Sequence, residues 1–174
     1  MKLVRWRRFV WQLAKLPAVD GKLPTHYHLR AATREEAEPV RRVIFSAFSL
    51  DSSWSDALQQ FRESLEGHIE AAFTHESVPG LVICHGQRII AASALTTVND
   101  AENHLLSGPC VLMEYRNRGL GTALLHYSLK QLQNAGLEQA CGVSKENVVA
   151  SKFVYPKFGS VSVPYDFAPL VVQT

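Results

Sequence analysis

The sequence predicts one α/β domain, and two observations lead to that class. Strand-like apolar runs alternate along the chain with segments whose apolar residues recur at helical spacing. The chain has 174 residues, of which 47% are hydrophobic and 20% charged, so it can bury one sizeable core and has the usual length of one domain. Its net charge of +2 provides no broad basic field, and we therefore expect no nucleic-acid partner.

Residues 1–24 predict a basic amphipathic helix and a linker that lie outside the main domain, which we place at residues 25–174. Four apolar residues recur at helical spacing and are bordered by lysine and arginine: Leu3, Trp6, Val10 and Leu13. The linker is expected from Pro17 to Pro24, because proline ends a helix. We expect the helix to pack on its own domain or on a partner subunit in a homodimer, with a membrane-surface position as the alternative.

The next 50 or so residues predict a strand and two helices by their apolar spacing. His26–Ala31 is the first expected strand, and Thr33 with Glu36 has the pattern of a capping box at the start of the first helix. Pro39 predicts an irregular first turn in that helix. The second helix follows Asp51, where apolar residues recur at i, i+3, i+4 and i+7.

The rest of the chain predicts a hairpin, a central helix and terminal strands. Leu81–Cys84 and Arg88–Val98 are expected to pair across a short turn. A strand ending at Met113 contains Gly108–Pro109, which predicts a bend or a break in it, and leads to a helix that stops at Gly136. The later elements are a strand at Glu138–Val143, a closing helix within Asn147–Gly159, and a strand pair at Val161–Val163 and Leu170–Val172.

The most informative segment is Arg116–Gly121, which lies between a strand and an amphipathic helix. Gly119 and Gly121 allow a tight turn and a close approach to a ligand, and the first amides of the following helix favour an anion. A Walker phosphate loop is excluded because no lysine follows Gly121, and a dinucleotide fingerprint is weak because Leu124 replaces its third glycine. We expect a pyrophosphate to bind at this turn.

This turn resembles the phosphate-binding turn of the GNAT acetyltransferase superfamily, whose pattern is Arg/Gln-x-x-Gly-x-Gly/Ala. Arg116, Gly119 and Gly121 are the matching positions, and the order of the predicted elements over residues 26–174 is also that of the superfamily. The resemblance implies a single GNAT-like α+β domain with a central, mixed, mostly antiparallel sheet flanked by helices, and acetyl-coenzyme A (acetyl-CoA) as cosubstrate. It places the cofactor on these residues: Val111, Leu112, Met113, Arg116, Asn117, Arg118, Gly119, Leu120, Gly121, Thr122 and Asn147.

A second match lies in Asn147–Gly159, which is similar to the closing helix of the superfamily. Tyr155 and Lys157 fall in step with that pattern, whereas Asn147 is one residue too early relative to Tyr155. Pro156 directly follows the tyrosine. Because proline lacks an amide proton, we expect the helix to end or kink there.

The resemblance implies direct acetyl transfer to a primary amine, which is a small molecule or a peptide. Tyr155 would protonate the departing thiolate, and amides near residues 111–113 would stabilise negative charge on the thioester oxygen. Glu114, His104 and a chain of water molecules are the candidates for the base that accepts the amine proton. The alternatives are a noncatalytic coenzyme A-binding regulatory module, suggested by the departures in the closing helix, and a docking protein built on the N-terminal helix.

Cysteine usage and hydropathy predict a cytoplasmic protein. The odd number of cysteines and their apolar surroundings indicate reduced, buried thiols: Cys84, Cys110 and Cys141. No apolar run approaches the ~18 residues of a transmembrane helix, and Gln12 and Lys15 interrupt the N-terminal run, so we expect no signal peptide. No metal is expected, because His26 and His28 have no third ligand in the sequence pattern.

Overall fold

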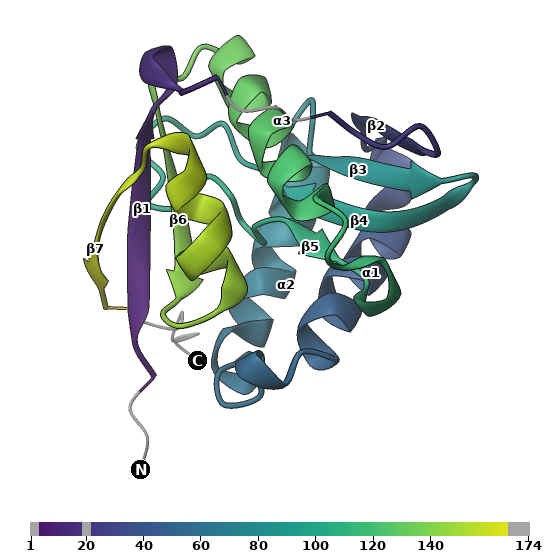
Figure 1. The fold of residues 1–174 in the computed structure, drawn as a ribbon, viewed down its shortest axis with the longest axis horizontal. Coiled ribbons are helices and arrows are strands. Elements are labelled where there is room, and N and C mark those ends of the chain that lie inside the picture. Colours follow the sequence, from purple (N-terminus) through teal and green to yellow (C-terminus); the bar gives the residue numbers. More distant parts are fainter. Residues whose placement is uncertain (1–3, 19–21, 167–174) are drawn as a thin grey trace.

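The computed structural model describes residues 4–18 and 22–166, and its strands form two antiparallel sheets (Figure 1). The strands are β1 (Trp6–Gln12), β2 (Tyr27–Ala31), β3 (Gly80–His85), β4 (Arg88–Ala94), β5 (Cys110–Val111), β6 (Gln139–Lys145) and β7 (Val161–Tyr165). One sheet has the order β2-β3-β4-β5, and the other has the order β6-β1-β7. The prediction of a single α+β domain with a mostly antiparallel sheet is confirmed.

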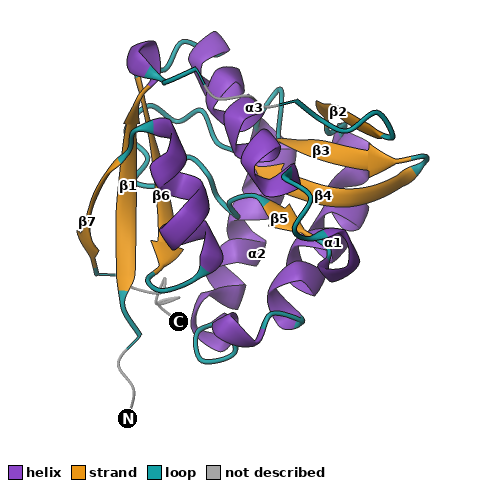
Figure 2. Ribbon diagram, in the orientation of Figure 1, coloured by secondary structure: helices purple, strands orange, loops and turns teal. Residues whose placement is uncertain are grey.

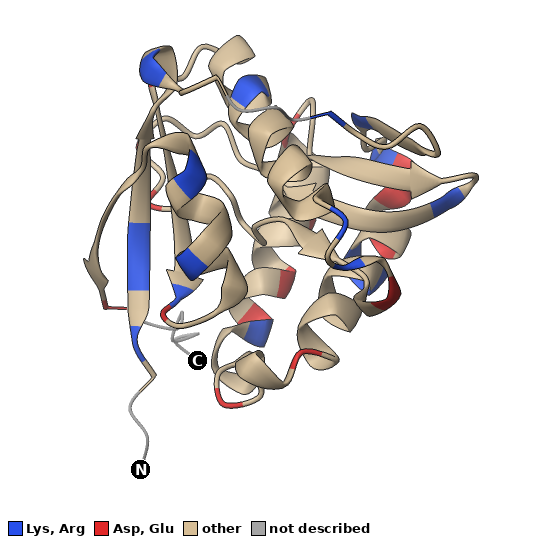
Figure 3. Ribbon diagram, viewed as in Figure 1, with Lys and Arg blue, Asp and Glu red and all other residues tan. Residues whose placement is uncertain are grey.

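Helices cover both faces of the four-stranded sheet (Figure 2). They are α1 (Ala37–Ser49), α2 (Leu58–His75) and α3 (Leu120–Asn134). α1 contacts β4 and β5 and packs beside α2, whereas α3 contacts β3 and β4 from the opposite face. Lysine and arginine are spread over sheets and helices among the described residues rather than gathered on one element (Figure 3). None of the helices described is long and apolar enough to cross a membrane.

The start of α1 follows the sequence prediction. The Thr33 amide donates to the Glu36 carboxylate at 2.9 Å, as a capping box requires. Residues Arg34–Glu36 form a 3₁₀ turn and the α-helix begins only at Ala37, so the irregular first turn expected from Pro39 is also found.

The N-terminal helix was a wrong prediction, because residues 6–12 form the central strand β1 of the second sheet. β1 pairs with β6 on one side and with β7 on the other. Phe9 and Trp11 are 2% and 0% exposed and alternate with the more exposed Val10 and Gln12, so this part of β1 shows the period of two that a strand requires. Tryptophan, phenylalanine and valine also favour strands, and two strands supply backbone partners here. The expected boundary near residue 24 therefore does not separate β1 from the rest of the fold.

The strand expected to end at Met113 is much shorter than predicted. Only Cys110–Val111 pair with β4, and an earlier contact remains as an isolated bridge between Leu95 and Leu105. Gly108 has a φ of 64°, and the proline after it lacks an amide proton. These two residues interrupt the strand, as their sequence suggested.

The closing helix changes geometry at Tyr155. Residues Ala150–Val154 form a π-helical turn, and Tyr155–Phe158 continue as a 3₁₀ helix with Pro156 in its first turn. Proline cannot supply the amide that a regular helix needs at this position, so the kink expected there is confirmed. Val161–Val163 lie in β7, whereas Leu170–Val172 lie outside the described residues.

Candidate active site

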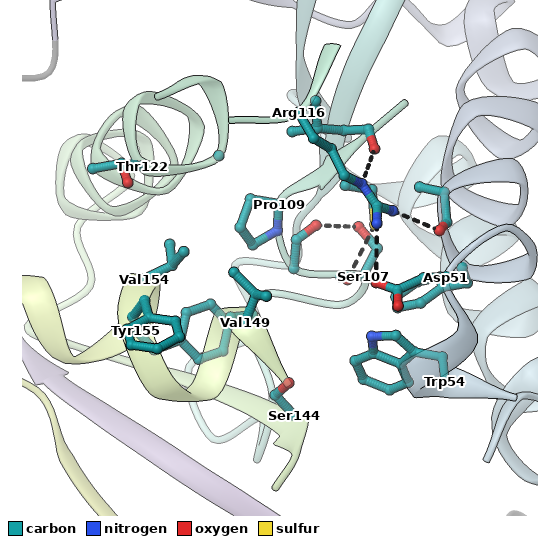
Figure 4. Close-up of a pocket in the computed structure, with 18 of the residues that line it drawn as sticks. Asp51, Trp54, Ser107, Pro109, Arg116, Thr122, Ser144, Val149, Val154 and Tyr155 are labelled. Carbon is teal, nitrogen blue, oxygen red and sulfur yellow. Dashed lines mark hydrogen bonds and ion pairs between the residues drawn. The ribbon is translucent and has the colours of Figure 1, made fainter. Parts of the chain in front are cut away.

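The two sheets separate between β5 and β6, and a cavity of about 380 Å³ opens where they part (Figure 4). The N-terminal end of α3 and the kinked closing helix line one end of it. Aromatic residues of β1, α1 and α2 line the other end, together with residues 103 and 106–108. The cavity therefore has two ends with β5 between them: an aromatic end, and an end at the N-terminus of α3, which we call the phosphate-binding end because the sequence predicts a phosphate there.

Backbone amides and one lysine form the phosphate-binding end. Gly119 caps α3 with a φ of 76°, and the Ala123 amide donates to the Gly119 carbonyl at 3.1 Å. The amides of residues 120–122 precede that first bond, so they remain available to an anion at the positive end of the helix dipole. Lys157 Nζ donates to Thr122 Oγ1 at 3.0 Å. A negatively charged group at this end would meet both the amides and the ammonium.

The two arginines of the turn are used for structure. Arg116 bonds to three groups through its guanidinium: the Ala47 carbonyl at 2.8 Å, the Val111 carbonyl at 3.2 Å and the Asp51 carboxylate at 3.1 Å. Arg118 donates to the Tyr27 hydroxyl at 2.8 Å and to the Glu114 carbonyl at 3.2 Å, and it does not line the cavity. The turn is thus fixed to α1 and β2, and its two arginine charges are not directed at a phosphate.

The free edge of β5 supplies a backbone donor in the middle of the cavity. The Leu112 amide donates to the Ile90 carbonyl of β4 at 3.0 Å. Because successive amides of a strand point to opposite edges, the Val111 amide faces away from β4, toward the gap before β6. Val111 lines the cavity there, so its amide can stabilise negative charge on a bound oxygen atom.

Tyr155 also lines the cavity despite the neighbouring proline. Its ring is 1% exposed and packs edge-to-face on Phe9 at 5.0 Å and on Trp11 at 5.3 Å. A Cβ built on Gly108 would lie 2.4 Å from the Tyr155 hydroxyl, so that hydroxyl lies directly beside the interrupted strand. Burial raises the pKa of Tyr155, with a smaller effect from Cys110. The hydroxyl is therefore protonated at neutral pH, and burial makes it a weaker acid than an exposed tyrosine.

The structure does not bring Glu114 into the cavity. Its side chain is 55% exposed and pairs with Arg88 at 3.0 Å. A backbone hydrogen bond and that guanidinium lower the pKa of Glu114, which makes it a weak base. His104 is 1% exposed, and both ring nitrogens are engaged: Nδ1 accepts from the Cys141 amide at 3.0 Å, and Nε2 lies 2.9 Å from the Val98 carbonyl.

The other expected cofactor residues divide into two groups. Those that line the cavity are Val111, Arg116, Asn117, Gly119, Leu120, Gly121 and Thr122. Those that do not are Leu112, Met113, Arg118 and Asn147. Asn147 is exposed with a φ of 68°, as its early position in the motif suggested. The sequence analysis did not place Lys157 in the site, although its spacing within the closing-helix motif was a usable signal.

The opposite end of the cavity is an aromatic wall that sequence reasoning missed. We use that name for Trp6, Phe48, Trp54 and Phe61, whose rings contact one another at 4.8 to 6.0 Å. The loop that carries Trp54 is held by Arg116 through Asp51, and by Lys145, which bonds to the Ser53 carbonyl and lies 2.5 Å from Asp56. Arg116 in the turn after β5 and Lys145 of β6 therefore hold this wall in place.

Comparisons with known proteins bear on the family and the fold of the chain. A family model described as the acetyltransferase (GNAT) family matches residues 41–159. A comparison with curated proteins finds no significant match.

Three solved structures share the fold at low sequence identity. A Drosophila protein is 16% identical, with a TM-score of 0.63 over 93% of this chain and 50% of its own. A GCN5-related N-acetyltransferase from Sphaerobacter thermophilus is 15% identical, with a TM-score of 0.61 over 94% and 50%. Another from Kribbella flavida is 17% identical, with a TM-score of 0.58 over 93% and 58%. The chain spans about half the length of these structures, and the likeness shows the fold.

Proposed function

Because the chain belongs to the GNAT acetyltransferase family, we propose that it is an N-acetyltransferase that moves an acetyl group from acetyl-CoA to a primary amine. The observation that carries the proposal is one cavity with an anion site, a strand-edge amide and a protonated tyrosine along it. Acetyl transfer from a thioester whose carrier bears a pyrophosphate uses these three groups.

The residues at the phosphate-binding end fit acetyl-CoA. The amides of residues 120–122 and Lys157 Nζ would hold its pyrophosphate, because each is a donor at a positive helix end. Gly121 leaves room for this approach, since a Cβ there would be in ordinary contact with Val111, 3.9 Å away, with nothing else nearby. When bound, acetyl-CoA supplies an activated acetyl group as a thioester.

Residues near β5 would then act on the acetyl group. The amine nitrogen attacks the thioester carbonyl carbon, so a C–N bond forms and the C–S bond breaks. The Val111 amide stabilises the negative charge on the carbonyl oxygen, and the Tyr155 hydroxyl gives its proton to the departing thiolate. Asp51 is the one carboxylate among the described residues that line the cavity, and it is paired with Arg116. We therefore propose that water removes the proton of the amine.

A noncatalytic coenzyme A-binding module is the second candidate. It is favoured by Asn147, which lies outside the cavity, whereas the position of Tyr155 inside the cavity favours an enzyme.

A cytoplasmic location stays a proposal and is supported by three buried free thiols: Cys84, Cys110 and Cys141. A homodimer also stays a proposal. Residues 6–12 form β1, so the N-terminal helix that was expected to dock on a partner subunit is not its basis.

Two measurements test these proposals. Calorimetric titration with coenzyme A should show binding that Gly121→Val abolishes while its far-ultraviolet circular dichroism is unchanged. The larger side chain would occupy the space that the pyrophosphate needs. Thiol release from acetyl-CoA with a panel of amines separates an enzyme from a binding module. Binding without turnover of any amine favours the module, and absence of binding contradicts both functions.

A further inference from the structure

The aromatic end of the cavity indicates which amines can reach the thioester, if the proposed function is correct. All four rings of the aromatic wall are only 7% or 8% exposed, and each lines the cavity. Ala47, Leu106 and Val143 add further apolar surface beside them. An acceptor bound here would exchange water for aromatic and aliphatic carbon over most of its body.

The charged groups around this end are already paired. Asp51 Oδ2 lies 3.1 Å from Arg116, and Asp51 Oδ1 accepts from the Ser53 amide at 3.0 Å and from the Ser53 hydroxyl at 2.6 Å. The remaining polar groups at this end are neutral, such as Ser144, whose hydroxyl points into the cavity (Figure 4). A second ammonium group on the acceptor would lose its water and find no spare negative charge among the described residues that line this end, which is costly.

Acidic residues do occur beyond the wall, in a second hollow of about 530 Å³ between α2 and residues 96–106. Glu76 there accepts three hydrogen bonds from Thr96 and Thr97 at 2.7 to 2.8 Å, and Glu102 accepts one from Tyr165 at 2.6 Å. The three neutral donors satisfy much of the Glu76 carboxylate.

Phe61 stands between the two hollows and lines both of them. Its ring contacts Phe48 at 5.2 Å, Trp54 at 5.3 Å and Trp6 at 5.8 Å. A ring held by three others cannot turn aside without breaking those contacts, so Phe61 acts as a partition. Asn103, Leu106 and Val143 also line both hollows, so these three side chains complete the partition with Phe61.

We propose that the acceptor is a small primary amine with one positive charge and an apolar, preferably aromatic, body. Aromatic rings prefer edge-to-face or offset contacts with other rings, which the wall offers. The cavity volume of about 380 Å³ includes the phosphate-binding end, so little space is left for a multi-ring antibiotic. Polyamines and aminoglycosides are disfavoured by their additional charges.

Matched substrates test this proposal on the full chain. Hexylamine and hexamethylenediamine share a six-carbon chain, and the diamine adds a second terminal amine. With acetyl-CoA saturating, we expect kcat/KM to be at least ~10-fold higher for hexylamine, since each 1.4 kcal/mol of charge-burial cost is a factor of ten. Phenethylamine should be better still, and an aminoglycoside should be poor. If kcat/KM for hexylamine is equal to or lower than kcat/KM for hexamethylenediamine, the proposal is overturned.

Two variants locate the cause of the preference. Asn103 borders both hollows, and its side-chain oxygen accepts from the Val143 amide at 3.2 Å, a bond that Asn103→Asp can keep. The new carboxylate should lower the hexylamine-to-diamine ratio several-fold. Phe61→Leu should reduce kcat/KM for phenethylamine more than for hexylamine, with an unchanged affinity for coenzyme A. An unchanged ratio in Asn103→Asp, or equal losses for the two amines in Phe61→Leu, would contradict the proposed wall.

The failure of this inference is distinguishable from the failure of the proposed function. A protein that binds acetyl-CoA and acetylates diamines, aminoglycosides or peptide N-termini in preference overturns only the acceptor class. Binding of acetyl-CoA without turnover of any simple amine also overturns it. A protein that does not bind coenzyme A overturns the proposed function.

Discussion

The two sheets of this molecule differ in how far apart in sequence their neighbouring strands lie. β3 and β4 are joined by a two-residue turn, and β2, which pairs with β3, is separated from it by α1 and α2. In the second sheet, Trp6 of β1 lies opposite Lys145 of β6 and Tyr165 of β7. The first sheet can be inferred from local patterns. The second depends on partners that lie more than a hundred residues away, which local patterns do not reveal.

The largest expected effect is on the second sheet. Every amide within a central strand has a partner strand beside it, so Val10→Pro removes a donor and distorts pairing with Cys141 or Val161. We expect this variant to be largely unfolded, whereas Val10→Thr, which keeps a β-branched side chain, should fold. Urea unfolding followed by circular dichroism checks both. A stable Val10→Pro protein would show that β1 is not essential to the sheet.

The next largest effect is on catalysis, where the two sheets meet. Tyr155→Phe keeps the ring packed on Phe9 and Trp11 but removes the acidic proton. We expect kcat to fall by ~10²–10⁴, the usual contribution of a general acid, with little change in coenzyme A affinity. A kcat within about twofold of the unmodified protein, well outside that range, would remove Tyr155 from the mechanism.

Gly108 tests the contact between Tyr155 and the interrupted strand. Gly108→Ala places a methyl group 2.4 Å from the Tyr155 hydroxyl at a φ of 64°, so it should destabilise the fold. Removing the hydroxyl relieves the clash but not the backbone strain. We therefore expect Gly108→Ala to cost less free energy of unfolding in the Tyr155→Phe background than in the unmodified protein. Strictly additive losses would mean that the two groups do not touch.

Two basic residues near the turn should separate structure from binding. Lys157→Ala removes a cation from the phosphate-binding end and should weaken coenzyme A binding by ~5–10-fold at low salt, with little change in stability. Arg116→Ala leaves Asp51 and two carbonyls without their donor, so it should lower the free energy of unfolding by roughly 1–3 kcal/mol. Calorimetric titration and urea unfolding of both variants measure the contrast. Equal affinity losses would place Arg116 on the phosphate after all.

The smallest expected effect concerns His104, which ties β6 to the loop before β5. Burial is the main cause that lowers the pKa of His104 below its ordinary 6.5, so the fold favours the neutral ring. As pH falls below about 6.5, the unfolded chain takes up a proton that the folded chain resists, and stability is lost. The free energy of unfolding should fall between pH 7.5 and pH 5.5, and His104→Asn should reduce that dependence. An identical pH dependence in the variant would assign it to other histidines.

The sequence predicted most of the first sheet and of the phosphate-binding end. These depend on neighbours along the chain, such as the strand, turn and helix around Gly119, whose geometry follows from local backbone preferences. It did not predict the roles of Arg116 and Arg118, because their partners Asp51 and Tyr27 are distant in sequence. It also placed Glu114 near the reaction, whereas the pair with Arg88 holds that side chain at the surface.

By itself, the amino-acid sequence determined the class of fold, the helix whose first amides are free, and the position of Tyr155 in the closing helix. Only the tertiary structure decided that residues 6–12 form a strand, since Trp6, Val10 and Leu13 have helical spacing while Phe9 and Trp11 have strand spacing, and β6 and β7 supply the backbone partners. It alone brought Trp6, Phe48, Trp54 and Phe61 together into one wall. The physical reason is that local propensities are short-ranged, whereas burial and sheet pairing depend on which distant segments meet.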